Sequence, residues 1–600
     1  MRADSALLFG PALAWTVAAT IGVAATLADD DAWSVVESRG EVVGSEQCRR
    51  CHPEQHASWH ASYHRTMTQS VSADEAIVLA PFGGETLRVA GFVATFSTAA
   101  SGRPHVSVVR ESDGREVLDT DVELTVGTHR YQQYVARLDR GGGALERWRL
   151  PFAWHPQAQR WIHLGGAFLF PDLAEGDTQA YLRHFSRWND NCVFCHNTEP
   201  VPGLGDDGTF DTTMGEVGIG CEACHGPAQA HLARQSNPLR RVLAGVGEPG
   251  DQAVTHPGRL APDRHSEVCG RCHGQRIGKD LSEVLAHGDG FIPGMPLREV
   301  SRPILAEGRL ASDPPGARPF APRFWRDGTP RLSAYEYQGL LLSPCYDEGQ
   351  GMSCGTCHTM HGEEPSMQLR AGADTDAACL GSCHDPASLA GHGGHETVGC
   401  QDCHMPRVTY GLLRGMISHR VTSPDPGALV GRDDMPDACT QCHVDQTRSW
   451  AAASVSSLGL QGTLAAESAE SAESAESDVS RVERDLVGGD PVQRALAAHA
   501  LARPEAVGSR ARRMQALVDA LEDDYPAVRW FGHQGLLAMA RTSEMQAALR
   551  RYDFMADAAE RIEVVDELRR TLGPSVVASQ SELWLQLLGQ RDDVAIAIGE

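Results

Sequence analysis

The pattern of apolar and polar positions divides the chain into unlike stretches, and the first is apolar throughout. Residues 5–28 carry no charge and are rich in Ala, Leu and Val, with Arg2 before them and three aspartates directly after. This is typical of an export signal, and Thr26 and Ala28 are small enough for a cleavage site. About 24 apolar residues can also span a bilayer. Residues 1–28 are therefore predicted to be a signal peptide, or an N-terminal membrane anchor if they stay uncleaved.

The next stretch, residues 29–71, contains a predicted helix over residues 54–67. Histidines recur at every fourth position there, at His52, His56, His60 and His64. Residues four apart lie on the same face of a helix, so the spacing predicts one stripe of imidazoles.

Residues 72–170 are instead rich in β-branched and aromatic residues in short runs, broken by Gly, Ser and Asp. Such runs are typical of strands joined by turns. They predict a small antiparallel sheet, inserted in the chain, with strands at residues 87–96, 105–109, 122–126 and 131–138.

The C-terminal part has a helical pattern. Residues 446–485 include Ala-Glu-Ser repeats and are predicted to be a low-complexity linker. Beyond it, within residues 486–600, Asp490-Pro491 and Tyr525-Pro526 each begin an amphipathic segment, and the two segments match at a spacing of 35 residues. That period predicts HEAT-like helical repeats, which could dock redox protein partners. An ordinary helical bundle is the alternative.

Composition and charge narrow the range of possible functions and partners. The formal net charge of −26 argues against nucleic-acid binding and favours a basic protein partner. Six hundred residues allow two to four domains, although aromatic residues make up 6% of the chain, which is low for a large core. A flat apolar cofactor would supply part of that core.

The strongest signal is a repeated Cys-x-x-Cys-His pentad. Together with one Cys-x-x-x-Cys-His variant it uses sixteen of the seventeen cysteines. In chain order, motifs one to eight are Cys48, Cys51, His52; Cys192, Cys195, His196; Cys221, Cys224, His225; Cys269, Cys272, His273; Cys354, Cys357, His358; Cys379, Cys383, His384; Cys400, Cys403, His404; and Cys439, Cys442, His443.

This spacing is that of covalent c-type haem attachment. Two thiols three residues apart reach the two vinyl groups on one porphyrin edge, and the adjoining histidine becomes the proximal iron ligand. Zinc ribbons and disulfide frameworks are the alternatives, but neither requires a histidine after every cysteine pair. The sequence therefore predicts eight haems, or seven if motif six, with its extra residue, stays unoccupied. Cys345 is left over and is predicted to be a buried thiol.

Distal iron ligands must come from the remaining histidines. The predicted set is His64, His60, His163, His231, His361, His395 and His419, with His56, His184 and His392 in reserve. His231 and His361 follow motif histidines too closely to share the same iron, so each is expected to serve a different haem.

Several of these segments resemble a bacterial family of multihaem, including octahaem, cytochromes c related to the tetrahaem electron acceptor of hydroxylamine oxidoreductase. The matching segments are Gly44 to Met67, Gln132-Gln133-Tyr134, Arg160 to Leu164, Trp188-Asn189, Gly220 to Pro227 and Cys400 to Pro406. The resemblance covers residues 44–445 and implies electron transfer, with His64 and His231 as axial ligands. Members often carry C-terminal helical repeats.

The predicted fold is thus a multihaem cytochrome c, mainly α and loop around stacked haems in residues 171–445, with the β insert and the helical domain attached. The expected function is a periplasmic octahaem carrier that passes electrons between redox partners through bis-histidine haems. The alternative is an oxidoreductase that acts on nitrite, hydroxylamine or tetrathionate at one open haem. No catalytic residue is assigned, since all eight motifs keep histidine.

Overall fold

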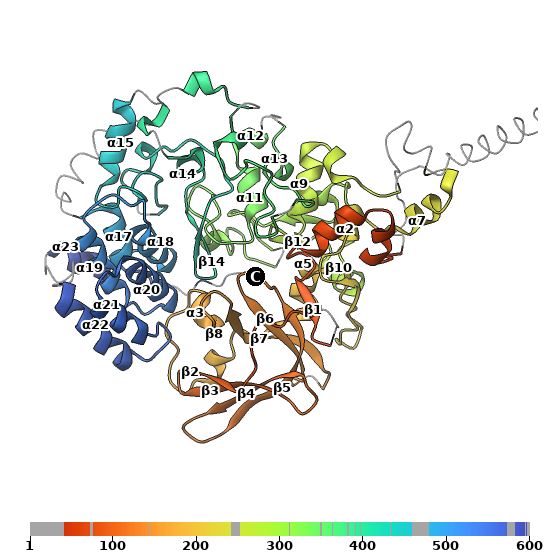
Figure 1. Cartoon of the computed structure of the whole chain (residues 1–600), viewed down its shortest axis with the longest axis horizontal. Helices are drawn as coiled ribbons and strands as arrows, with labels where there is room; N and C mark the ends of the chain where they lie inside the picture. The colour runs from red at the N-terminus through yellow and green to blue at the C-terminus, as the bar shows by residue number, and fades with distance from the viewer. Residues whose placement is uncertain are drawn as a thin grey trace, which may run out of the picture.

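The computed structural model describes residues 41–572 except 73–75, 142, 240, 242–252, 311, 348–350, 363, 381–382, 390–391, 396–397, 433 and 459–478, and it also describes 582–593 and 596. The predicted signal peptide and residues 459–478, which are half of the predicted linker, lie outside these residues. The prediction was wrong for the other half of the linker, because its described residues include a helix at Arg448–Ser457 and the start of another at Arg481. In Figure 1 a sheet (orange) lies below the motif-bearing loops (yellow to green), and the C-terminal helices (blue) lie at one side. Within the described ranges, no helix is both long enough and apolar enough to cross a membrane.

One antiparallel sheet of nine described strands forms the β region. Its central path runs β2-β3-β4-β5-β6-β7-β8, with β1 on β5 and β9 on β7. The strands are β1 (Thr68–Ser70), β2 (Glu85–Val89), β3 (Phe92–Thr98), β4 (Pro104–Arg110), β5 (Glu116–Val126), β6 (Gln132–Leu138), β7 (Glu146–His155), β8 (Arg160–His163) and β9 (Ser186–Arg187).

Alternation of side chains explains how the sheet builds its core. Phe92, Ala94 and Phe96 of β3 are fully buried, whereas the residues between them are half-buried. Ala90 and Gly91 join β2 to β3 with φ of 51° and 75°. A two-residue hairpin turn needs this left-handed conformation, which glycine adopts at no steric cost.

The helix predicted over residues 54–67 is shorter in the structure. Helix α2 (Pro53–His60) ends at His60, and the Arg65 side chain donates to the His60 carbonyl at 2.8 Å. The prediction of one continuous histidine stripe was therefore wrong, because His64 lies in the turns after the helix. Those turns carry His64 away from the helix axis toward another part of the chain.

The motif region is built from short helices and two-stranded ribbons. The ribbons are β10 (Asn197–Val201) with β11 (Thr213–Val217), β12 (Arg276–Gly278) with β13 (Ser301–Pro303), and β14 (Thr409–Gly411) with β15 (Arg414–Met416). The helices are α3 (Leu164–Ala167), α4 (Thr178–Tyr181), α5 (Val193–His196), α6 (Glu222–His225), α7 (Gln229–Gln235), α9 (Pro262–Gly270), α10 (Leu281–His287), α11 (Glu336–Leu341), α12 (Pro344–Asp347), α13 (Cys354–Cys357) and α14 (Cys400–His404).

The C-terminal part is helical, as the sequence pattern indicated. Its helices are α15 (Arg448–Ser457), α17 (Arg481–Gly488), α18 (Pro491–Ala502), α19 (Arg510–Ala520), α20 (Pro526–Met539), α21 (Ser543–Arg551), α22 (Ala558–Leu572) and α23 (Glu582–Gly589). The two matching segments form α18 and α20, each with proline in its first turn. Asp490 caps α18 and forms a capping box with Gln493, which satisfies the first free N–H groups.

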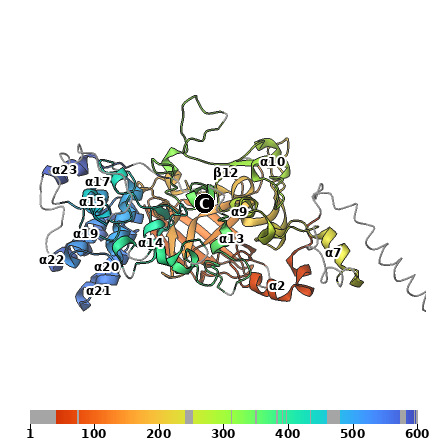
Figure 2. The ribbon, with the colours of Figure 1, turned by 90° about the horizontal axis from the view of Figure 1, so that it is seen from above.

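These helices share one hydrophobic core with the sheet and the motif region. Tyr410 and Leu332 are fully buried in the same cluster as residues of α18 and α20. Ion pairs cross the boundary as well, and in one of them the buried Arg529 of α20 donates to Asp172 at 2.6 Å. Figure 2 shows these helices packed at one end of the molecule. The described helices of the C-terminal part are therefore held to the remainder of the chain by apolar burial and by the buried charge of Arg529.

Candidate haem-binding sites

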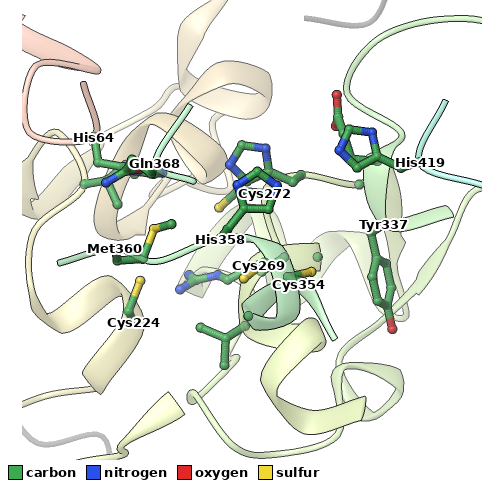
Figure 3. Close-up of a pocket in the computed structure, with 18 of the residues that line it drawn as sticks. His64, Cys224, Cys269, Cys272, Tyr337, Cys354, His358, Met360, Gln368 and His419 are labelled. Atoms are coloured by element: carbon green, nitrogen blue, oxygen red, sulfur yellow. The ribbon is translucent and has the colours of Figure 1, made fainter. Parts of the chain in front are cut away.

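Motifs one to seven line one continuous cavity of about 2650 Å³. Each of the seven contributes at least one cysteine and its histidine, and the walls come from segments as distant in sequence as Cys48 and Thr422. Figure 3 shows part of it, where His64, His358 and His419 line the wall together with Cys224, Cys269, Cys272 and Cys354. Folding thus brings seven motifs that are scattered along the chain to the walls of one cavity.

Within a motif, a helical turn fixes the histidine relative to the first cysteine. The His52 N–H donates to the Cys48 carbonyl at 2.9 Å, and the same bond recurs in motifs three, four, five and eight at 2.8–3.0 Å. Motif six keeps it too, because the His384 N–H donates to the Cys379 carbonyl at 3.0 Å. This bond spans five residues, whereas it spans four in the regular motifs. Motif six therefore keeps the link between its histidine and its first cysteine despite the extra residue.

Several motif histidines are oriented by a hydrogen bond at Nδ1. This atom lies 2.7 Å from the Thr255 carbonyl oxygen in His225, 3.0 Å from that of Met367 in His358, and 3.1 Å from that of Thr422 in His404. A carbonyl oxygen can only accept, so Nδ1 carries the proton and Nε2 keeps its lone pair for a metal.

Five motif histidines face a second histidine across a gap. The ring centres lie 6.3 Å apart in His52–His231, 6.1 Å in His64–His273, 6.3 Å in His225–His361, 6.0 Å in His392–His404 and 6.1 Å in His395–His443. Two imidazoles that share one metal, at about 2.0 Å per bond, have ring centres about 6 Å apart. Each gap is thus the width that an iron with two axial histidines requires, so these residues fit haem.

His419 lies near a sixth motif histidine, His358, and burial lowers the pKa of both imidazoles. Burial also lowers the pKa of His64 to about 4, with His273 adding to the effect. A neutral imidazole is the form that binds a metal. These side chains are therefore in their metal-binding state at neutral pH.

Two of the seven predicted distal histidines do not face a motif histidine in these contacts. The ring of His60 stacks on that of His56 at 5.8 Å. His163 is fully buried outside the described lining of the cavity, and both its nitrogens are used: Nδ1 accepts from the Gly165 N–H at 3.1 Å and Nε2 contacts the Tyr181 carbonyl at 2.9 Å. The structure thus argues against His163 as an iron ligand, because ligation would break one of these bonds.

His392, in contrast, is only a reserve ligand in the sequence prediction, yet its ring faces that of His404. Its position in the sequence could not reveal this contact. The chain must fold back at Gly393 and Gly394, both with positive φ, to aim His392 and His395 at different motifs.

Contacts between motif cysteines give the order in which the sites adjoin. Each thiol affects the pKa of its neighbour in four pairs, which are Cys48–Cys221, Cys195–Cys272, Cys269–Cys354 and Cys379–Cys400. The charge of one thiol also raises the pKa of the other in Cys224–Cys272, Cys357–Cys379 and Cys403–Cys442. The motifs thus form a series one, three, four, five, six, seven, eight, with motif two branching from motif four.

Motifs two, five and six lack the ring pair seen in the other motifs. All 26 histidines lie in the part of the chain that the structure describes, and no ring contact there pairs His196, His358 or His384 with a second imidazole, although His419 and His273 interact electrostatically with His358 and His196, respectively. His196 instead meets Trp188 edge-on at 5.7 Å, and the charge of Arg149 adds to the burial that lowers its pKa to about 4.

Cationic side chains also line the cavity. Arg407 is half-buried and Arg414 is exposed. Partial desolvation lowers the pKa of both guanidinium groups, and repulsion from Arg503 and Arg130, respectively, adds to the effect. An anionic group bound nearby would offset this repulsion. The two carboxylates of a haem are groups of that charge.

Comparison with known proteins agrees with these sites. Residues 387–483 match the family model of cytochrome c552, and residues 173–226 match that of cytochrome c554 and c-prime. The chain is a multihaem c-type cytochrome. Its structure also matches one entitled "Crystal Structure of Outer Cell Wall Cytochrome OcwA", at 15% identity and a TM-score of 0.41, over 88% of this chain and 99% of that one. Among curated proteins no match is found.

Proposed function

We propose that this cytochrome carries electrons one at a time through eight covalently bound haems, between redox proteins outside the cytoplasm. The observation that supports it best is that motif thiols influence one another's pKa in an unbroken series through motifs one, three, four, five, six, seven and eight, all but the last of which line one cavity. Haem groups held at these motifs would adjoin one another, which is what stepwise electron transfer needs. Export is supported by the apolar N-terminal stretch, since covalent c-type attachment in bacteria takes place outside the cytoplasmic membrane.

The same proposal has three further parts. They are kinship with the octahaem family named above, stacking of the haems, and HEAT-like stacking of the C-terminal helices. The match of residues 173–226 to the cytochrome c554 model supports the first. The spacing of 35 residues between the starts of α18 and α20 supports the last.

Eight haems are expected in the purified protein, including one at motif six. The reason is the His384-to-Cys379 hydrogen bond, which preserves the motif turn despite the extra residue. An intact-mass measurement counts the covalent haems, and it locates the mature N-terminus as well. A double variant, Cys379→Ala with Cys383→Ala, should lose the mass of one haem.

Cys345→Ala is the matched control, because this cysteine belongs to no motif. It should retain all eight haems. A wild-type mass with seven haems and two free thiols at Cys379 and Cys383 would show that motif six is unoccupied.

A second candidate function is catalysis at motif two. It is favoured by one observation, namely that no second imidazole is recorded opposite His196. Chemistry at haem iron needs a vacant or exchangeable axial position. A small nitrogen or sulfur compound such as nitrite, hydroxylamine or tetrathionate would be the substrate class.

Electron paramagnetic resonance of the oxidised protein separates the two candidates. If motif two is catalytic, a high-spin ferric signal is expected, and it should shift when nitrite or hydroxylamine is added. If the protein is a carrier alone, neither compound should change the spectrum. Entirely low-spin iron would rule out the catalytic candidate.

A further inference from the structure

Motif eight is set apart from the other seven. None of Cys439, Cys442 and His443 is among the described residues that line the shared cavity, and neither is the facing His395. His395 is exposed. Motif eight also comes last in the series of motifs, next to motif seven. The charge of Cys442 raises the pKa of Cys403, and that of Cys403 raises the pKa of Cys439. Motif eight is therefore the terminal site of the series, and it lies at the surface.

Exposed apolar side chains surround this motif. Trp450 is 36% exposed, and its ring centre lies 4.7 Å from that of His443. Leu458 is 50% exposed and packs beside Gly394, the residue before His395. Val507 is 49% exposed, and its N–H donates to the Cys442 carbonyl at 2.7 Å. Large apolar side chains at the surface around one site are typical of a protein-binding patch.

Among the described residues, the exposed charges that act on motif eight are two carboxylates. Asp445 acts on His443, and Arg503, Asp402 and Glu505 act on Cys442, with Arg503 acting most strongly. Arg503 offsets part of this charge, at 3.2 Å from Asp402 and 3.5 Å from Glu505. Asp445 and Glu505 are exposed. An apolar centre with a carboxylate rim is complementary to a protein whose own apolar patch is ringed by lysine or arginine.

We propose that a small cationic haem protein docks on this motif-eight face, formed by Trp450, Leu458, Val507, Asp445 and Glu505, and exchanges electrons with this protein there. The inference rests on the proposed carrier function and names the face and the partner's chemistry. One electron leaves this protein and reduces the partner's ferric iron to ferrous. No bond is made or broken, and no proton moves.

Trp450 contacts the proximal imidazole and also reaches the surface, so it is the contact residue of this face. Buried tryptophan contributes more to binding than most interface residues. Carboxylates at the rim act instead through long-range attraction, which raises the association rate and weakens with added salt.

The test uses the full haem-loaded protein and lysine-rich mitochondrial-type cytochrome c as the probe. Binding of the ferric probe to the ferric protein is measured first, since it needs no turnover. Stopped-flow oxidation of the dithionite-reduced protein by the ferric probe follows, at low and high salt.

We expect Asp445→Asn with Glu505→Gln to lower the second-order rate at least fivefold at low salt, with little effect at high salt. Trp450→Ala should weaken binding about tenfold.

Matched controls lie on the sheet, far from motif eight in the fold. Glu111→Gln removes an exposed carboxylate, and Leu145→Ala truncates a side chain that is 66% exposed. Both should behave as wild type. Equal rates and affinities for all variants, or faster reaction with an acidic flavodoxin than with the basic probe, would overturn the proposal. If Trp450→Ala fails to accumulate, the carboxylate variant decides alone, because its side chains are exposed.

Failure of the carrier function gives a different result. In that case the reduced wild type would deliver fewer electrons to excess probe than the number of haems counted by intact mass, because its haems would not exchange electrons with one another. If only the docking proposal fails, the reduced protein will still deliver one electron per haem, and the variants will react at the wild-type rate.

Discussion

Replacing His64 with alanine will convert one haem, the one attached at motif four, from low-spin to high-spin ferric iron. The ring of His64 lies 6.1 Å from that of His273, and its low pKa of about 4 keeps it neutral and able to bind iron. Removing it leaves one axial position without a protein ligand. Electron paramagnetic resonance should show one new high-spin signal in addition to any wild-type signal, while the intact mass keeps the same number of haems.

His60→Ala is the matched control, since His60 lies four residues earlier and was also a candidate ligand. Its ring stacks on His56 at 5.8 Å, so the spin state of every haem should stay as in the wild type. A new high-spin signal in His60→Ala, with none in His64→Ala, would show that the structure assigns the wrong histidine to motif four.

Replacing Arg529 with methionine will destabilise the whole protein by about 3–5 kcal/mol. Arg529 is fully buried and donates to the Asp172 carboxylate and to the carbonyls of Asp523 and Phe554, at 2.6–3.1 Å. Methionine keeps much of the stem but leaves the two carbonyls without this donor, while the Asp172 carboxylate keeps only its bond from Arg561 at 3.0 Å. The thermal unfolding midpoint should fall by about 5 °C or more.

Arg551→Met is the control, because its ion pair with Glu567 is exposed and such pairs contribute little. Its midpoint should stay within about 1 °C of wild type. Since Arg529 ties α20 to the chain before motif two, unfolding should be followed both by helix content and by haem absorbance. Loss of helix at the lower temperature with unchanged haem absorbance would contradict the shared core, and would indicate a helical domain that unfolds by itself.

Local chemistry was readable from the sequence. Covalent attachment depends on the spacing of two thiols and a histidine within five residues, and this spacing can be read directly from the sequence. Strands such as β3 and helices such as α18 could be predicted because alternation and capping are also local. The end of α2 at His60 could not, because the turns that follow are fixed by long-range contacts such as the bond from the Ile219 N–H to the His64 carbonyl at 3.0 Å.

By itself, the sequence determined the attachment chemistry, the excess of negative charge, the β insert and the helical C-terminal part. Tertiary structure decided which histidines meet. His64, His231 and His361 each face a motif far from their own neighbours in sequence, and His392 reaches His404 because of a bend at two glycines. It also decided that motif eight lies outside the cavity shared by the other seven. Pairs of this kind depend on distances across the folded chain, which no local spacing encodes.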